Sequence, residues 1–182
     1  MSKSLDDIKN LRMPVFSWDY EDLGEADHWF LMAHAYFDCS YCLFTEMAKE
    51  AFDRNYHRAL VAVSLFNHSI ELFLKAAIIR ASKKATSTHN LEQLFNQYKK
   101  LYPGKIFEFK GEMISVIGPH QNTPYNEFAR YPTDHTGQPW PGYAHIDIAI
   151  WYERLGAFQK DFERLEPLIK ERYPEKTNSG PQ

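Results

Sequence analysis

The sequence predicts an all-α protein, an up-and-down bundle of four to five helices with a long Pro/Gly-rich loop before the C-terminal helix. Two observations lead to this prediction. Apolar residues recur at steps of three and four over long stretches, which places them on one face of a helix. The connections between these stretches are short apart from one, and no segment gives a convincing sheet.

The chain has 182 residues, enough for one domain that buries a substantial core without disulfides. We expect an N-terminal arm over residues 1–24, a single helical bundle domain over residues 25–174 and a flexible tail over residues 175–182. The arm is acidic and the tail is polar, so neither has the pattern of a core element. No internal repeat divides the chain.

Composition and charge narrow the class of protein. Apolar residues make up 44% of the chain and charged residues 25%, the balance of an ordinary soluble domain. The net charge of −3 argues against coating nucleic acid by bulk charge, but not against a local basic groove. The first residues lack the apolar core of a signal peptide, and the most apolar stretch, residues 59–66, is too short to span a bilayer. We therefore expect a cytoplasmic protein without a membrane segment.

The first two helices are each predicted from an apolar stripe. One is expected over about residues 26–53 and the next over about residues 56–84, with Asn55 between them. The second is apolar around most of its circumference, so we expect it at the centre of the bundle. Its main apolar face consists of Ala59, Val63, Phe66, Ile70, Phe73, Ala77 and Ala81.

A short amphipathic helix is expected over about residues 90–102, because Pro103 and Gly104 stop it. The next residues, 105–123, are ambiguous. Residues 106–109 alternate like a strand, whereas residues 111–117 fit a helical turn.

A long loop and a final helix complete the chain. Residues 118–142 are rich in proline and glycine, and a loop of this length in a small domain is often functional. The last helix is expected over about residues 143–172. Its predicted buried residues are Ile146, Ile150, Leu155, Phe158, Phe162 and Leu165.

Two short motifs have spacings used by metal or redox sites. Cys39-x-x-Cys42 falls in mid-helix and lacks two further ligands, so small residues in or near the core is the better interpretation. Glu25-x-x-His28 has the spacing of half a di-iron site, but the chain contains no second Glu-x-x-His. We therefore expect no metal site and no cofactor.

A polar stripe interrupts the central helix. Asn67, Glu71 and Lys75 fall at four-residue steps and so share one face. One interpretation makes this stripe a wall of a substrate cleft, with Lys75 binding substrate. The other, which we favour, makes Glu71 and Lys75 a surface or interfacial ion pair, because an unpaired charge in the core is too costly.

The groups best suited to chemistry are Arg130 and His135, which precede the last helix. A guanidinium holds a phosphate and stabilises its growing charge, while an imidazole transfers a proton near neutral pH. Together they can cleave an RNA phosphodiester without a metal, and aromatic residues such as Tyr131 can stack on unpaired bases. The alternative is that Arg130 pairs with Glu127 or Asp134 and His135 packs the loop.

The segment Phe66-Asn-His-Ser-Ile-Glu-Leu-Phe-Leu-Lys-Ala76, followed by His89-Asn-Leu91, resembles the HEPN superfamily of helical domains. The Arg130-x4-His135 spacing is similar to the Arg-x(4–6)-His motif of that superfamily. These marks lie within about residues 56–172. The Arg-x4-His spacing is the least specific of them.

The resemblance implies a helical bundle that commonly forms a homodimer, in which paired motifs face one cleft and, in active members, cut RNA without a metal. It makes Arg130 and His135 the candidate catalytic residues. Tyr131 and Lys75 are the candidate substrate-binding residues, and RNA or a nucleotide is the expected ligand. The alternative is a non-catalytic dimeric interaction module with a regulatory protein partner.

Overall fold

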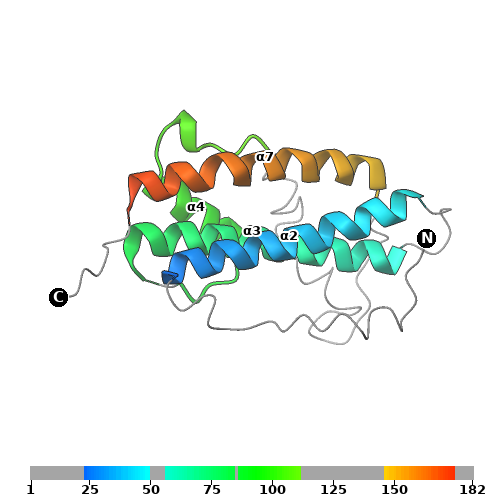
Figure 1. Ribbon diagram of the computed structural model, residues 1–182, viewed down its shortest axis with the longest axis horizontal. Coiled ribbons are helices and arrows are strands. Elements are labelled where there is room, and N and C mark those ends of the chain that lie inside the picture. The colour runs from blue at the N-terminus through cyan, green and yellow to red at the C-terminus, as the bar shows by residue number, and fades with distance from the viewer. Residues whose placement is uncertain (1–22, 50–55, 85, 112–145, 175–182) are drawn as a thin grey trace.

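A computed structural model describes residues 23–49, 56–84, 86–111 and 146–174. Within these ranges the chain forms four α-helices and one short 3-10 helix, with no strand, which confirms the all-α bundle (Figure 1). The helices are α2 (Glu25–Lys49), α3 (Tyr56–Ser82), α4 (Leu91–Leu101) and α7 (Ile148–Arg172), and the 3-10 helix is η3 (Lys105–Phe107).

The predicted helices agree with these bounds within a few residues. The strand alternative for residues 106–109 is wrong, because η3 begins at Lys105 and the residues after it have no regular structure. The alternation of apolar and polar residues over positions 106–109 arises because a 3-10 turn buries Phe107 and the residues after it leave Phe109 half-buried.

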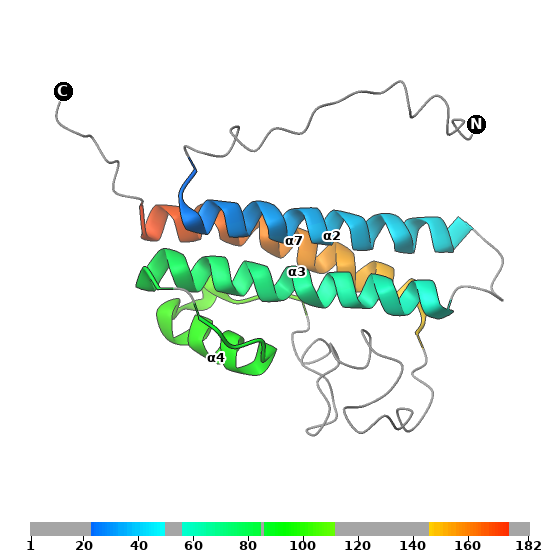
Figure 2. The same cartoon turned by 90° about the horizontal axis from the view of Figure 1, so that it is seen from below.

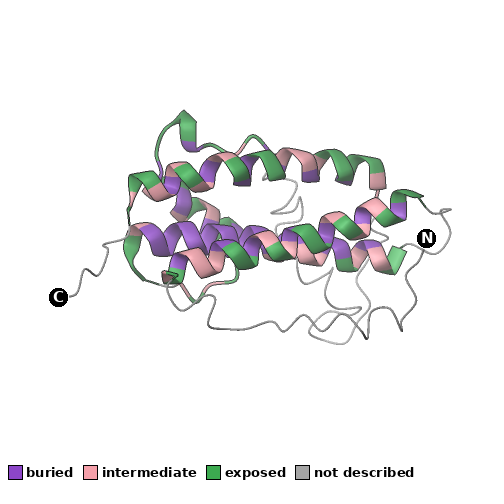
Figure 3. Ribbon diagram, in the orientation of Figure 1, coloured by how far each residue is buried: buried purple, intermediate pink, exposed green. Residues whose placement is uncertain are grey.

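Helix α3 lies at the centre of the bundle, with α2 and α7 along it and α4 against its C-terminal half (Figures 1 and 2). Helix α2 runs antiparallel to α3, since Trp29 reaches Lys75 while Ser40 reaches Ala62. Every residue of α3 from Ser69 to Arg80 is buried, as Figure 3 shows. The predicted central position is therefore confirmed.

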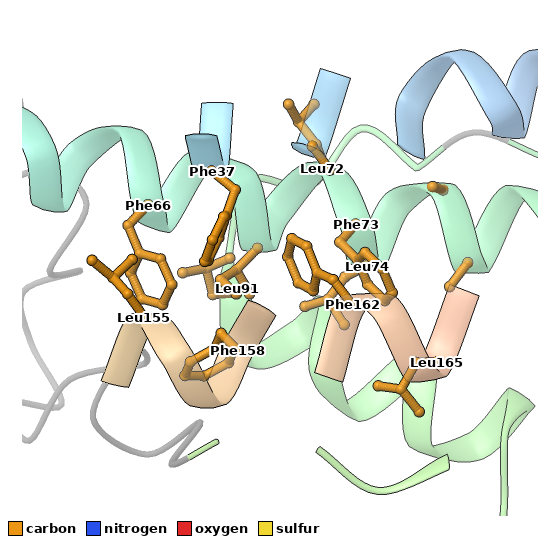
Figure 4. Packing of buried hydrophobic residues seen from close by; sticks show 14 of the residues in the cluster. Phe37, Phe66, Leu72, Phe73, Leu74, Leu91, Leu155, Phe158, Phe162 and Leu165 are labelled. Atoms are coloured by element: carbon orange, nitrogen blue, oxygen red, sulfur yellow. The ribbon is translucent and has the colours of Figure 1, made fainter. Parts of the chain in front are cut away.

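Aromatic rings form much of the contact between α3 and its neighbours (Figure 4). The rings of Phe73 and Phe162 stack with centroids 4.1 Å apart, and Phe66 meets Phe158 edge-on at 5.1 Å. Phe37 of α2 contacts Phe66 and Phe162. Offset and edge-on ring pairs add stabilisation beyond the apolar area that they bury, so three helices share one aromatic core.

Two expectations about burial are wrong. Ile150 is 47% exposed, because the inward face of α7 follows Trp151, Leu155 and Phe158 at helical spacing. Cys39 and Cys42 are both exposed, since the inward position between them belongs to Ser40, whose hydroxyl donates to the carbonyl of Ala62.

By length and composition alone, helix α3 could cross a membrane. The expectation from the sequence concerned only residues 59–66 inside it, which are too few to span a bilayer. Most of its apolar window, 83%, is buried inside the bundle. A core helix of this kind passes the same test, so the burial favours a role in the protein core.

A chain of ion pairs joins α2, α3 and α7 near one end of the bundle. Asp27 pairs with Arg80 at 3.2 Å and with Lys170 at 2.8 Å. Lys170 also pairs with Glu166 at 2.6 Å, and His34 contacts the same carboxylate at 2.7 Å. A network in which several charges share partners is more stabilising than isolated surface pairs.

Asp161 anchors residues 106–111, which follow the start of η3. Its carboxylate is fully buried and accepts hydrogen bonds from the backbone N–H groups of Lys110 and Gly111, each at 2.7 Å. Arg164 pairs with Asp161 at 2.7 Å and donates to the carbonyl oxygens of Ile106 and Glu108. The chain is therefore fixed against α7 at the last described residue before position 112.

The contact of Gly111 with Phe158 gives a matched pair of glycine substitutions. A Cβ atom at Gly111 would lie 2.7–3.0 Å from the Phe158 ring, whereas one at Gly156 meets nothing within 4 Å. We expect Gly111→Ala to lower the free energy of unfolding by about 1–3 kcal/mol, as overpacking does. Gly156→Ala, in mid-helix, is expected to raise it by about 0.5–1 kcal/mol. Urea unfolding followed by circular dichroism measures both, and equal stability of the two variants would contradict the expected clash.

Candidate functional site

The predicted site residues fall in different parts of the chain. Arg130, Tyr131 and His135 lie between Gly111 and Ile146, outside the described residues. Lys75 lies on α3 and is described. The geometry of a candidate site is therefore built from α3 and the residues packed around Lys75.

Lys75 and Glu71 form a buried ion pair. The Nζ atom of Lys75 lies 2.9 Å from Oε1 of Glu71, and the two side chains are only 5% and 2% exposed. The indole ring of Trp29, on α2, lies 5.7 Å from the same Nζ atom. The ion pair favoured from the sequence forms, but it is buried within the chain and not on its surface.

Two histidines approach the same carboxylate. Nδ1 of His89 lies 2.8 Å from Oε1 of Glu71, a hydrogen bond, and Nδ1 of His68 lies 3.6 Å from Oε2, a close contact beyond hydrogen-bond length. Burial alone would raise the pKa of Glu71. The contacts of His68, Lys75 and His89 outweigh it and lower the pKa to about 2, so the carboxylate is ionised at neutral pH.

Local structure before α4 positions His89. Asn90 caps the helix, because its side-chain oxygen accepts from the N–H of Gln93 at 2.9 Å. The hydroxyl of Thr88 accepts from the N–H of Asn90 at 3.2 Å and donates to the side-chain oxygen of Gln93 at 2.9 Å. This capping structure holds residues 88–93 together, and His89 within it reaches back to α3.

His68 packs against α2. Its ring meets the ring of Tyr36, on α2, edge-on with centroids 4.5 Å apart. Its side chain is 27% exposed, whereas that of His89 is 71% exposed. The cluster of Glu71, Lys75, His68 and His89 therefore has a buried carboxylate and a solvent-facing imidazole.

Asn67 adds an unusual feature one turn before Glu71. It is 1% exposed, and among the residues that the structure describes neither its amide nitrogen nor its amide oxygen has a hydrogen-bond partner. A buried polar group left unpaired costs about 1–3 kcal/mol, so such groups are rare in folded proteins. Asn67, Glu71 and Lys75 therefore share one face of α3 as predicted, but all three are buried.

Sequence reasoning placed Glu71 and Lys75 together but did not bring His68 or His89 to them. The spacing of His68 three residues before Glu71 is a local signal that predicts a shared face. His89 lies on a different element, and only its place in the family motif drew attention to it. Its contact with Glu71 is a tertiary contact that no helical periodicity predicts.

The cluster around Glu71 does not resemble a metal site. Within residues 23–49, 56–84, 86–111 and 146–174, no three or more His, Cys, Asp or Glu residues are arranged to hold a metal ion. The ammonium group of Lys75 occupies the position beside Glu71 that a cation would need.

Comparison with known proteins identifies a family. A family model described as the HEPN domain matches residues 43–149. The match includes all of α3, all of α4 and the segment that carries Arg130 and His135. No curated protein and no solved structure matches the chain.

The buried ion pair gives a test of how the site is held. We expect Glu71→Gln to lower the free energy of unfolding by about 3–5 kcal/mol, because it leaves the ammonium group of Lys75 buried without its counter-charge. The double variant Glu71→Gln/Lys75→Met removes the charge as well and is expected to recover most of that loss. Chemical denaturation of the three proteins at pH 7 measures this. A double variant no more stable than Glu71→Gln would show that the loss has another origin.

Proposed function

Because the chain belongs to the HEPN domain family, whose model matches more than half of its residues, we propose that it binds RNA or a nucleotide. In the sharpest form of this proposal the protein is a metal-independent endoribonuclease of the toxin or defence type. The observation that carries it is the extent of the family match, which contains both Arg130 and His135.

In the proposed reaction Arg130 binds the phosphate and His135 transfers a proton. Arg130 holds the scissile phosphate and stabilises the charge that grows on its oxygens in the transition state. His135 takes the proton from the ribose 2′-hydroxyl or gives one to the leaving 5′-oxygen. The products are a 2′,3′-cyclic phosphate and a free 5′-hydroxyl, and DNA is refused because it lacks the attacking hydroxyl.

Substrate binding is proposed for Tyr131 and Lys75. An aromatic ring such as that of Tyr131 stacks on an unpaired base. The role of Lys75 is constrained by its contacts, because its Nζ atom already pairs with Glu71 and its side chain is 5% exposed. Direct contact of Lys75 with a phosphate therefore requires that ion pair to open.

We also propose that the protein works as a cytoplasmic homodimer. One histidine cannot easily act as both base and acid in a single step, and a dimer supplies a second His135. Supporting this arrangement, the outer side of α2 exposes large apolar residues, with Leu31 45% and Met32 50% exposed. Exposed apolar residues gathered on one helix are typical of interaction surfaces.

The same surface supports an alternative function. A HEPN domain without catalysis would serve as a dimeric protein-interaction module, for example with a separately encoded regulatory protein. Leu31 and Met32 lie on the side of α2 that faces away from α3, so a partner helix can approach without displacing the core. A wild-type protein that forms a dimer but does not cleave RNA would favour this alternative.

RNA cleavage is the direct test of the catalytic proposal. We expect the wild-type protein to cut single-stranded RNA in the presence of a chelator and to leave 2′,3′-cyclic ends. Arg130→Ala and His135→Ala are each expected to slow cleavage by about 10²-fold or more. His120→Ala, which changes another histidine of the same segment, is the control and should retain activity. Intact RNA with the wild type, or equal cutting by all four proteins, would end the nuclease proposal.

Association is tested separately from cleavage. We expect Leu31→Glu/Met32→Glu to shift the protein from dimer to monomer, because charges placed in an apolar interface are desolvated without partners. Analytical ultracentrifugation across a concentration series measures the change. Val61→Glu, at a similarly exposed residue of α3, is the matched control. An unchanged dimer in the double variant would exclude this face as the interface.

A further inference from the structure

The outward face of α2 carries few charges for a helix surface that meets water. Helices α3 and α7 lie on one side of α2, where Phe37 contacts both of them (Figure 2). On the other side, the exposed residues between Glu25 and Glu46 are Leu31, Met32, Ala35, Asp38, Cys39 and Cys42. Only Asp38 among them is charged. The outer face of a surface helix is usually rich in charges, so this face fits a surface that another helix covers.

A continuous seam runs along this face for the whole length of α2. Its two ends are polar and consist of Glu25 and His28 at the start of the helix and Glu46 and Lys49 at its end. Its middle consists of Met32, Ala35, Cys39 and Cys42. Successive members of the seam are three or four residues apart throughout, and none of them is buried. This is the spacing with which one helix contacts another over several turns.

The charges of the seam are complementary to those of the same seam in reverse. Phe37 is the middle residue of α2, so two antiparallel copies of the helix can pack with Phe37 at the same height. Glu25 of one copy then faces Lys49 of the other. His28 likewise faces Glu46, and two-fold symmetry makes each contact twice. In a parallel pair Glu46 would face Glu46 and Lys49 would face Lys49, which is repulsive.

The sizes of the side chains support the same register. It places Ala35 opposite Cys39 of the second copy, next to the point where the two helices cross. Small residues at a crossing point allow two helix axes to approach closely. Larger side chains lie further from the centre, with Met32 50% exposed and Leu31 45% exposed. They fill the space where two crossing helices diverge.

We propose that α2 packs in an antiparallel pair against α2 of a second copy of this chain, in the register that places Ala35 opposite Cys39. This inference rests on the homodimer proposed above and gives that dimer a two-fold axis and a set of facing residues. Cys39 and Cys42, which are exposed in one copy, become covered in the pair. Free cysteines then act as small apolar packing groups, as they commonly do in protein interiors.

Cross-linking between two single-cysteine proteins tests the register. One protein carries Cys42→Ser and keeps Cys39, and the other carries Ala35→Cys together with Cys39→Ser and Cys42→Ser. Mixed and treated with oxidised glutathione, they should form a disulfide-linked heterodimer on a non-reducing gel. Neither protein alone should cross-link, because identical positions are then about 6 Å apart along the axis in addition to the gap between the helices. A disulfide requires Cα atoms within about 4.4–6.8 Å of each other.

Ala48 provides a matched control, because it is an exposed alanine of the same helix outside the seam. In the control mixture Ala48→Cys replaces Ala35→Cys, and no heterodimer is expected. A heterodimer formed equally well with Ala48→Cys, or cross-linking within either single-cysteine protein alone, would overturn the antiparallel register. Circular dichroism checks that the variants are folded, which is expected because every substituted residue is exposed.

Charge exchange tests the contact between the ends of the seam. Glu25→Lys places two cations opposite each other in the proposed pair, and Lys49→Glu places two carboxylates there. We expect each single variant to raise the Kd of the dimer by about threefold to tenfold, since two exposed ion pairs are lost. The double variant Glu25→Lys/Lys49→Glu should return the Kd close to that of the wild type. Sedimentation across a concentration series measures it, and a double variant as weak as the sum of the two losses would exclude this contact.

The outcomes distinguish this inference from the proposals on which it rests. A wild-type protein that stays monomeric at every concentration overturns both the homodimer and the pairing of α2. A dimer that gives no heterodimer cross-link between Cys39 and Ala35→Cys overturns only the pairing of α2 and assigns the dimer to another surface. Neither experiment contains RNA, so its result is independent of whether the protein is a ribonuclease.

Discussion

The enclosure of the C-terminal half of α3 on all sides is the constraint on which the rest of the structure depends. A helix buried from Ser69 to Arg80 can carry charges only if each finds a partner within the protein. Glu71 finds Lys75 and His89, and Arg80 finds Asp27 and the backbone carbonyl of Tyr173. These contacts attach α2, the start of α4 and the end of α7 to the central helix.

The same constraint links stability with chemistry. Glu71 contributes to the fold by neutralising a buried ammonium group, and it orients His89 with the same carboxylate oxygen. A residue with both duties is hard to replace, since a substitution that spares the imidazole contact must also satisfy Lys75. Asn67, one turn away, has no such compensation, and its two unpaired amide atoms are a local weakness of the helix.

The sequence was sufficient for features that depend on local spacing. Helical periodicity predicted the four described helices and the central place of α3, because a helix apolar all round has to be enclosed. Four-residue spacing likewise predicted that Glu71 and Lys75 would pair. Their burial was not predictable in the same way, since spacing shows that residues share a face without showing what covers it.

Features that depend on neighbouring elements were missed. His89 reaches Glu71 across eighteen positions of sequence, through a turn whose course is set by the capping of α4. Cys39 and Cys42 were assigned near the core because small residues suit it, but Ser40 occupies the inward position by bonding to α3. Arg130, Tyr131 and His135 lie outside the described residues, so their assignment still rests on the sequence and on the family.

The attachment at Asp161 has a consequence for how proteins of this architecture diversify. One carboxylate of α7 holds the backbone at Lys110 and Gly111, after η3, and it does so through N–H groups that every residue except proline provides. Natural selection can therefore exchange the sequence that follows without redesigning its point of attachment. The attachment therefore depends on Asp161 of α7 and on the backbone of Lys110 and Gly111, and not on the identity of the side chains that come after them.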